Sequence, residues 1–213
     1  MTRIFVSLAR VPVRRLAPLG VLASLAAVGF AIPATAAAKV TSLTACQAIT
    51  APGSYRLDAD LTTFSDCFDI TASGVTLNLN GHSITTPLGM GSFGIDVAGG
   101  AANTNVVGPG TVTGWNTDAI GFDGSNGSVR GVTVTDNFVG ISIGGPDNSI
   151  RGNVATRNGD AGIVANSGAT DTTIIGNYAH DKAEDLVDDN LADCDNNVWR
   201  GNDFGTANQS CIH

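Results

Sequence analysis

Residues suited to acid–base chemistry recur in one kind of turn of this sequence, the turn that leads into a short Gly-Ile segment. His180 could act there as a base, and Arg157 could hold the carboxylate of a substrate. Asp118, Asp181 and Asp185 could act as acids, and the last two could also bind Ca²⁺. The candidate catalytic residues are therefore His180, Asp181, Asp118, Asp185 and Arg157.

Three neighbours of these residues could bind the substrate. Trp115 offers a flat aromatic face on which a sugar ring could stack. Lys182 could hold a carboxylate, and Asp160 adds a further polar group to the same turn. The candidate substrate-binding residues are Trp115, Lys182 and Asp160.

Glycan cleavage needs several such groups in one groove. A hydrolase needs two carboxyl groups beside the bond, one of them protonated. A β-eliminating lyase needs a cation or Ca²⁺ to neutralise a uronate carboxylate, and a base to remove a proton. The alternative is that these turns are charged because they are solvated.

An acidic run from residue 184 to residue 197 is a separate candidate, for Ca²⁺. Its carboxylates could form an irregular site from Asp185, Asp188 and Asp189, because it lacks the glycine and terminal glutamate of an EF-hand loop. A solvated cap tied down by Cys194 is the alternative. Asp188 falls at a nominally inward position, which costs free energy unless the carboxylate is paired or the strand ends there.

A repeat supplies the elements that position these turns. Residues 128–143, SVRGVTVTDNFVGISI, are followed by residues 149–165, SIRGNVATRNGDAGIVA, with offsets of 21 to 22 residues between equivalent positions. A fixed period of this size predicts a solenoid, in which stacked turns bury an apolar side together. Abundant Gly, Val, Ile, Thr and Asn and sparse charge favour short strands, so the fold class is all-β.

Strand alternation assigns the faces of each turn. In the Gly-Ile segments we expect the following residues to form the core: Ile95, Ile120, Ile141, Ile163 and Leu186, with Val97, Phe122, Ile143 and Ala165. The outward column between them is Asp96, Gly121, Ser142, Val164 and Val187. This column carries one charge, which is little for a catalytic face.

Two other columns recur in the first strand of each turn and in the bend after it. Arg130, Arg151 and Arg200 share an outward position with Ile175, where they are solvated or bind an anionic ligand. Asn153, Asn177 and Asn202 each follow a glycine, at a bend where asparagine tolerates unusual backbone angles. Because an amide both donates and accepts, we expect these asparagines to bond one another along the axis.

The first 38 residues have a basic start, an apolar run and small residues near Ala36, so residues 1–38 are predicted to be a secretory signal rather than a membrane anchor. They hold four of the eleven basic residues and no acidic residue, so the remainder has 7 basic and 19 acidic residues, a net charge of −12. Nucleic acid and other polyanions are therefore unfavourable partners unless a cation bridges them to the protein. We expect a secreted protein without a stable membrane anchor, and a monomer.

Export favours disulfides among the four cysteines, and the sequence permits three pairings. The local pairing, Cys46–Cys67 and Cys194–Cys211, would secure each end of the solenoid. We expect one β-helix domain, 39–213, with an N-terminal cap at 39–70, about six coils at 71–206 and a C-terminal cap at 207–213.

The Gly-Asn bends, the Gly-Ile strands and the period of about 22 residues resemble the right-handed parallel β-helix of the pectin-lyase-like superfamily. The resemblance implies that the Gly-Ile strands line a glycan groove and that catalytic side chains lie in the turn before them. Asn116-Thr117-Asp118 resembles the Asn-Thr-Asp segment of polygalacturonases. Phe138-Val139-Gly140 stands where that family has paired aspartates, so the catalytic motif is incomplete.

This resemblance leaves two functions open. The first is a secreted polysaccharide lyase or glycoside hydrolase that acts on an extracellular polysaccharide, with Ca²⁺ as a possible cofactor. The second is a non-catalytic surface or matrix protein that binds glycans or serves a structural role. Convergence of the candidate residues in one groove would favour the enzyme.

Overall fold

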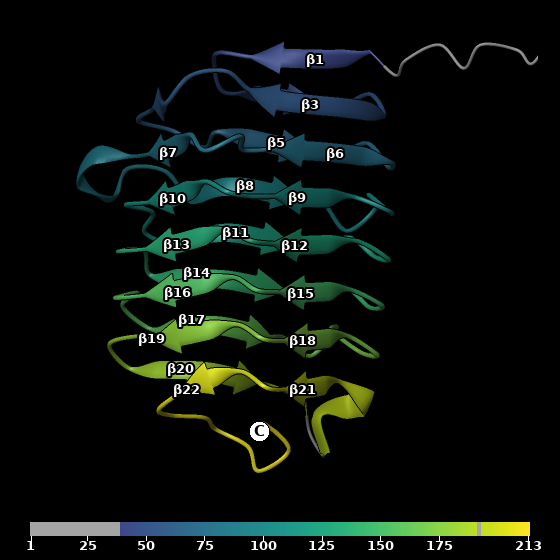
Figure 1. Cartoon of the computed structure of the whole chain (residues 1–213), viewed down its shortest axis with the longest axis vertical. Coiled ribbons are helices and arrows are strands. Elements are labelled where there is room, and N and C mark those ends of the chain that lie inside the picture. The colour runs from purple at the N-terminus through teal and green to yellow at the C-terminus, as the bar shows by residue number, and fades with distance from the viewer. Residues whose placement is uncertain (1–38, 191–192) are drawn as a thin grey trace, which may run out of the picture. The chain divides into compact units, whose positions relative to one another are not determined.

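The structure is a computed structural model that describes residues 39–190 and 193–213. In this part of the chain every turn passes through three parallel sheets (Figure 1). The first, the β12 sheet, consists of β1 (Val40–Leu43), β3 (Gly53–Leu57), β6 (Val75–Asn78), β9 (Asn105–Val107), β12 (Ser128–Arg130), β15 (Ser149–Arg151), β18 (Thr173–Ile175) and β21 (Val198–Arg200).

The second strand of each turn belongs to the β13 sheet. Its members are β4 (Leu61–Thr62), β7 (Ser83–Thr85), β10 (Thr111–Thr113), β13 (Thr133–Thr135), β16 (Val154–Thr156), β19 (Tyr178–His180) and β22 (Asp203–Phe204). The Gly-Ile segments form the β14 sheet. Its members are β2 (Gln47–Ile49), β5 (Phe68–Ile70), β8 (Phe93–Val97), β11 (Asp118–Phe122), β14 (Val139–Ile143), β17 (Ala161–Ala165) and β20 (Glu184–Asp188). Two short 3₁₀ helices, η1 (Pro87–Gly89) and η2 (Asp193–Asn196), complete the described elements.

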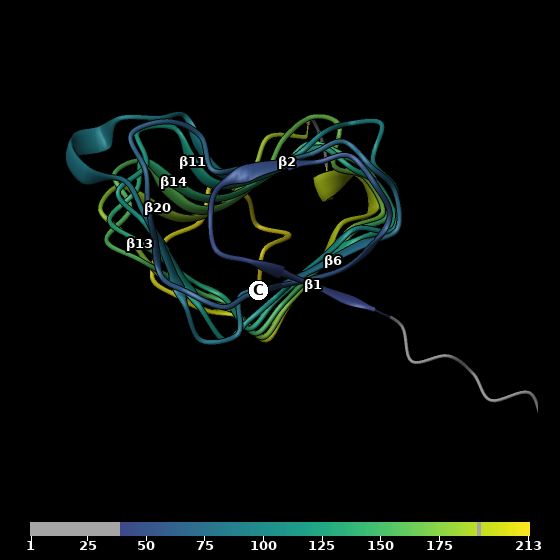
Figure 2. The same cartoon turned by 90° about the horizontal axis from the view of Figure 1, so that it is seen from above.

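These sheets confirm the all-β parallel solenoid, with about seven turns in the described residues rather than six. The additional turn comes from residues 40–70, which showed no clear period in the sequence but place strands in all three sheets. Seen down the axis, the sheets form the sides of a closed cross-section, and the β14 sheet curves inward (Figure 2). No helix in the described residues is long and apolar enough to cross a membrane.

The core forms where the alternation predicted it. Ile95, Ile120, Ile141, Ile163 and Leu186 follow one another in register, and each is fully buried. Burial of a side chain of this size contributes about 1.5–3 kcal/mol. Each apolar residue is covered by the equivalent residue of the next turn, so the core continues through the stack.

The predicted asparagine ladder is present at the bend between the β12 and β13 sheets. The side-chain oxygen of Asn177 accepts hydrogen bonds from the backbone and side-chain nitrogens of Asn153, both at 3.0 Å. The Asn177 side-chain nitrogen donates to Asn202 Oδ1 and to the Ile150 carbonyl, also at 3.0 Å. The left-handed backbone angle belongs to the preceding glycines, such as Gly176 with φ of 66°, and not to the asparagines as expected.

A second ladder lies at the bend before the β14 sheet. Asn137 Oδ1 accepts the Trp115 backbone N–H at 3.1 Å, and Asn158 Oδ1 accepts the Asn137 backbone N–H at 3.1 Å. Asp181 Oδ1 then accepts the backbone N–H of Asn158 at 2.7 Å. Side-chain oxygens thus satisfy bend N–H groups that have no partner in the sheets.

Both ends of the solenoid carry a disulfide, in the predicted pairing. Cys46 bonds Cys67, with Cα atoms 4.4 Å apart, and Cys194 bonds Cys211, with Cα atoms 6.2 Å apart. All four cysteines of the chain are therefore paired. Such disulfides persist in an oxidising compartment.

The ladder predicts the effect of removing one rung. Asn177→Ala removes the acceptor of the buried Asn153 backbone N–H, one of the two acceptors of the Asn153 side-chain nitrogen and the side-chain donor to the Ile150 carbonyl, so we expect the free energy of unfolding to fall by about 3 kcal/mol. Asn116→Ala, on an exposed loop, is the matched control and should change it by less than about 0.5 kcal/mol. Urea denaturation with intact disulfides measures both, and equal values for the two variants would contradict the ladder's role.

Candidate functional site

The predicted site residues do not converge. Trp115 is 1% exposed and belongs to the core, where a Cβ on Gly91 or Gly94 would collide with its ring. Its indole nitrogen has no hydrogen-bond partner among the described residues. Trp115 therefore presents no face to a sugar, and the structure gives no support to the predicted stacking role.

Asp185 and Asp181 serve the fold in this structure. Asp185 is 4% exposed, and its two oxygens accept the backbone N–H groups of Asp181, Gly205 and Thr206 at 2.6–2.8 Å. Burial disfavours the charged form, but these N–H groups outweigh it and lower the pKa of Asp185. Asp181 ends the second ladder, and burial raises its pKa. Both oxygens of Asp185 are therefore engaged by the fold, whereas Asp181 Oδ2 is buried without a hydrogen-bond partner among the described residues.

The remaining predicted residues are exposed and lie apart from a groove. Arg157 forms a two-point ion pair with Asp136, with nitrogen–oxygen distances of 3.0 and 2.6 Å. His180 lies 3.3 Å from Asp203, at the surface of the β13 sheet. Lys182 and Asp160 are exposed in the turns that lead into β20 and β17. Surface ion pairs and exposed charged side chains of this kind are expected of solvated turns.

The predicted Ca²⁺ ligands also separate. Asp188 is fully buried, and its oxygens accept hydrogen bonds from the side chains of Asn190, Asn197 and Trp199 at 2.7–3.1 Å. This explains how a carboxyl group can occupy an inward position, because each lone-pair direction has a donor. Asp189 is exposed, and no three metal-binding side chains converge in the described residues.

A different set of carboxyl groups lies together on the outer face of the β14 sheet, which we call the acidic face. Asp69 of β5 pairs in register with Asp96 of β8, and Asp96 pairs with Gly121 of β11. Asp69 was missed because the segment around it, Phe68-Asp69-Ile70, lacks the glycine of the other Gly-Ile strands. The similarity of Phe68-Asp69-Ile70 to Ile95-Asp96-Val97 is the sequence signal that would have identified Asp69.

Asp118, a predicted catalytic residue, occupies the first position of β11 on this face. Its register partner in β8 is Phe93, which is half-buried. The Phe93 ring lies over Gly121, where an added Cβ would approach two ring carbons at 3.1 Å and Asp96 Oδ1 at 3.5 Å. Phe93 thus lies on the same side of the sheet as Asp96, and it offers the aromatic surface that Trp115 does not.

Electrostatics distinguish Asp118 from its neighbours. Burial raises the pKa of Asp118 to about 6, the Ser142 hydroxyl partly offsets this, and Asp123 and Asp96 raise it further. The pKa of Asp96 is also raised, by burial first and then by Asp123, Asp69 and Asp66. The shift at Asp118 is the larger, so Asp118 keeps its proton to a higher pH than Asp96.

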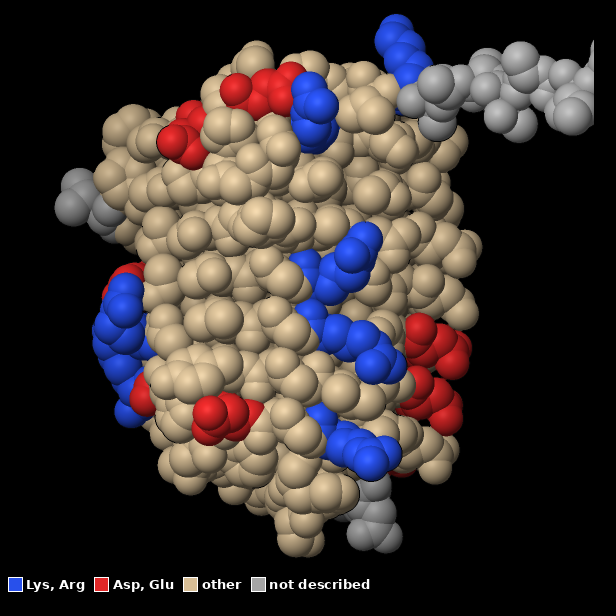
Figure 3. All heavy atoms as spheres, viewed as in Figure 1, with Lys and Arg blue, Asp and Glu red and all other residues tan. Residues whose placement is uncertain are grey.

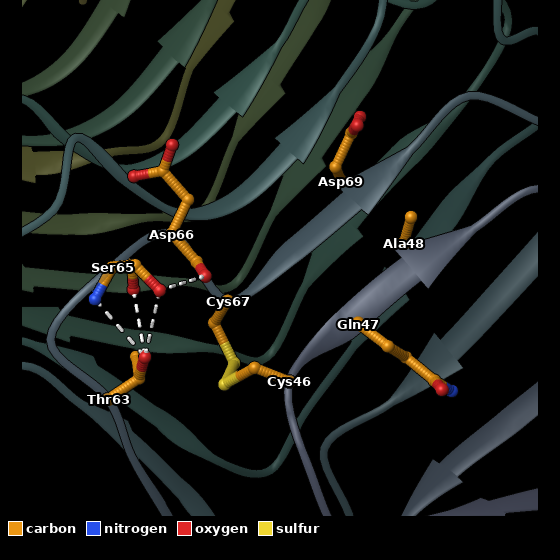
Figure 4. Close-up of a pocket in the computed structure, with 8 residues that line it drawn as sticks. All are labelled: Cys46, Gln47, Ala48, Thr63, Ser65, Asp66, Cys67 and Asp69. Atoms are coloured by element: carbon orange, nitrogen blue, oxygen red, sulfur yellow. Dashed lines mark hydrogen bonds between the residues drawn. A yellow bond between two sulfur atoms is a disulfide. The ribbon is translucent and has the colours of Figure 1, made fainter.

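The acidic face begins at a hollow near the N-terminal end of the sheet. A cavity of about 320 Å³ lies between β2, β5 and the loop from Thr63 to Cys67. Asp69 and Ala48 project from neighbouring strands into its border, and the Cys46–Cys67 disulfide closes one side (Figure 4). From Asp69 the column continues to Asp96, so the cavity and the acidic face are continuous.

Farther along the β14 sheet the outer face is mostly apolar, with Glu184 exposed at the start of β20. Val139, Ala161, Val164 and Val187 form a small cluster separate from the core. None of the seven described strands of this sheet carries a lysine or arginine. The face therefore combines carboxyl groups, one aromatic ring and an apolar surface.

No protein-family model, curated protein or solved structure matches this chain. The chemistry of the acidic face is therefore inferred from its own residues. A protonated carboxyl group beside ionised ones can transfer a proton at weakly acidic pH.

The environment of Asp188 predicts that it stabilises the fold and binds no metal. Asp188→Asn directs an amide N–H group at side-chain donors, so we expect the free energy of unfolding to fall by about 3 kcal/mol. Asp189→Asn, on the exposed neighbour, should be nearly neutral. Millimolar Ca²⁺ or EDTA should leave the melting temperature of the parent protein unchanged, and a clear rise with Ca²⁺ would contradict this assignment.

The raised pKa of Asp118 predicts a pH-dependent stability. The folded state keeps a proton that the unfolded chain, with a pKa near 3.8, releases, so stability falls as the pH rises from about 4 to about 6. Asp118→Asn removes this cost, and should stabilise the protein at about pH 8 by on the order of 1 kcal/mol, a value reduced by solvent screening. Near pH 4 the variant and parent should melt alike. A pH-independent difference in melting temperature would exclude the shift.

Proposed function

We propose that this protein is an exported glycoside hydrolase that acts on a neutral polysaccharide along the acidic face, and that it belongs to the pectin-lyase-like superfamily. The observation that carries the proposal is the half-buried Asp118 carboxyl group, with a pKa of about 6, beside Phe93 and near Asp96. Paired disulfides and the basic and apolar start of the sequence support export.

In this mechanism Asp118 is the general acid. It donates its proton to the glycosidic oxygen while the bond from that oxygen to the anomeric carbon breaks. Asp96, whose pKa is raised less than that of Asp118, is the general base and accepts a proton from the water that attacks the anomeric carbon. The water oxygen ends on the sugar, and the departing sugar leaves with the proton from Asp118.

The register predicts inversion at the anomeric carbon. Asp96 lies one strand and three residues from Asp118, which corresponds to a backbone separation of about 11 Å at ordinary strand dimensions. Inverting enzymes keep their carboxyl groups roughly 6.5–9.5 Å apart to leave room for the water, whereas retaining enzymes keep them about 5 Å apart. Two side chains that lean toward one another across this separation fit the inverting arrangement.

The charges of the face favour a neutral substrate. Asp69, Asp96, Asp118 and Asp123 would repel a uronate polymer, and no cation on the strands of the sheet offsets them. A β-eliminating lyase lacks its cationic base there for the same reason. Phe93 and the apolar cluster around Val164 can pack against the faces of uncharged sugar rings.

Hydrolysis of neutral polysaccharides tests the proposal. The purified protein should release reducing ends from one member of a panel of glucans, mannans and xylans, with a rate that falls above about pH 6 as Asp118 loses its proton. Asp118→Asn should lower kcat by about 10²–10⁴-fold with little change in KM. Phe93→Ala should mainly raise KM.

Asp203→Asn is the matched control, because Asp203 is an exposed aspartate of the β13 sheet and should leave the rate unchanged. Unsaturated uronate products would indicate a lyase and overturn the mechanism. Binding of a polysaccharide without any release of reducing ends, with Asp118→Asn equal to the parent, would favour the non-catalytic glycan-binding protein instead.

A further inference from the structure

Three arginines form one outward column on the β12 sheet. Arg130 of β12 pairs in register with Arg151 of β15, and Ile175 of β18 separates Arg151 from Arg200 of β21. All three arginines are exposed. Figure 3 shows basic side chains one above another along this side of the molecule. Neighbouring strands lie about 4.8 Å apart. The backbones of Arg130 and Arg151 are therefore one strand spacing apart, and those of Arg151 and Arg200 are two strand spacings apart.

This arginine row has no internal partner. No carboxylate of the described residues lies within 4.0 Å of Arg130, Arg151 or Arg200. Arg151 Nε instead donates to the Ser149 hydroxyl at 2.7 Å, which holds its guanidinium near the strand surface. A stack of like charges is unfavourable unless something outside the protein neutralises it.

Other arginines of the same chain show the contrast. Arg56 stands higher in the same column, and its Nε lies 2.7 Å from Asp58. Arg157 is paired with Asp136 in the same manner. With 19 acidic residues in the sequence, unpaired arginines in one straight row are a specific feature of the β12 sheet rather than a general property of the surface.

We propose that the arginine row binds a linear acidic polysaccharide, one that carries a carboxylate or sulfate on successive sugars and lies along the solenoid axis. Guanidinium groups bind such oxyanions through two parallel hydrogen bonds. A column with a fixed spacing suits a polymer whose charges recur at regular intervals. The row lies on a different sheet from Asp118, so the proposal does not depend on hydrolysis at the acidic face.

The neighbouring column argues against nucleic acid as the ligand. It consists of small side chains, Ser128, Ser149 and Thr173, followed by Val198. Single-stranded nucleic acid binds through exposed aromatic rings that stack on its bases, and the strands that carry the row offer none, because Trp199 of β21 is buried.

Binding of polygalacturonate to the full mature chain tests the proposal, with dextran as the neutral polymer and single-stranded DNA as the alternative polyanion. We expect binding of polygalacturonate that weakens with added salt, and no binding of dextran. The triple variant Arg130→Gln, Arg151→Gln, Arg200→Gln should bind about thirtyfold more weakly, or about threefold for each arginine. Ile175→Arg fills the gap in the row and should strengthen binding.

Two controls accompany these variants. Arg56→Gln, in the same column but paired with Asp58, should have less effect than any single change in the row, and Asp118→Asn should have none. Binding by the triple variant equal to that of the parent would overturn the proposal. So would single-stranded DNA binding as tightly as polygalacturonate and losing affinity in the same triple variant. Since binding needs no turnover, failure of hydrolysis leaves this result intact.

Discussion

The structure depends on one constraint, the in-register stacking of parallel strands turn upon turn. Register places each side chain directly against its equivalent in the next turn. A residue type that recurs at one position must therefore pack well against, or hydrogen-bond to, further copies of itself. Apolar columns meet this condition by packing, and amide columns meet it because each amide both donates and accepts. Asn153, Asn177 and Asn202 thereby accept the bend N–H groups of Val132, Asn153 and Asn177.

The same constraint makes departures from a column informative. A column of carboxylates or of guanidinium groups repels itself, and protonation of a carboxyl group, counterions or a bound ligand of opposite charge reduces the repulsion. On the acidic face the response is a shift in protonation, because Asp118 and Asp96 lie near other carboxyl groups in a partly buried setting. On the arginine row no protonation change is available, since arginine does not lose its proton in this pH range.

The sequence predicted the fold, the core columns and the asparagine ladder, because each follows from a period of 2 or of about 22 residues. The disulfide pairing was predicted on a different ground, because the local pairing secures each end of the solenoid. The site was predicted less well because alternation fails at the start of the β14-sheet strands. Consecutive residues there are both buried, as in Ala119-Ile120 and Asp185-Leu186, so Asp185 lies inside rather than in the groove. Trp115 similarly stands at a bend whose direction no local pattern specifies. Asp69 lay in a turn without a recognisable repeat, and its role depends on contacts between turns that pairing alone reveals.

Two charged columns therefore run along one rod on separate sheets, with opposite sign. Each crosses the strands at right angles, so a polymer on either column lies along the solenoid axis. Under the two proposals, the acidic face would repel the acidic chain that the arginine row would bind, so charge alone would separate the two ligands. Such a solenoid would bind an acidic polymer through the arginine row of the β12 sheet and a neutral polymer through the acidic face of the β14 sheet. Its straightness, set by the ladders within the bends, keeps both columns aligned over several turns.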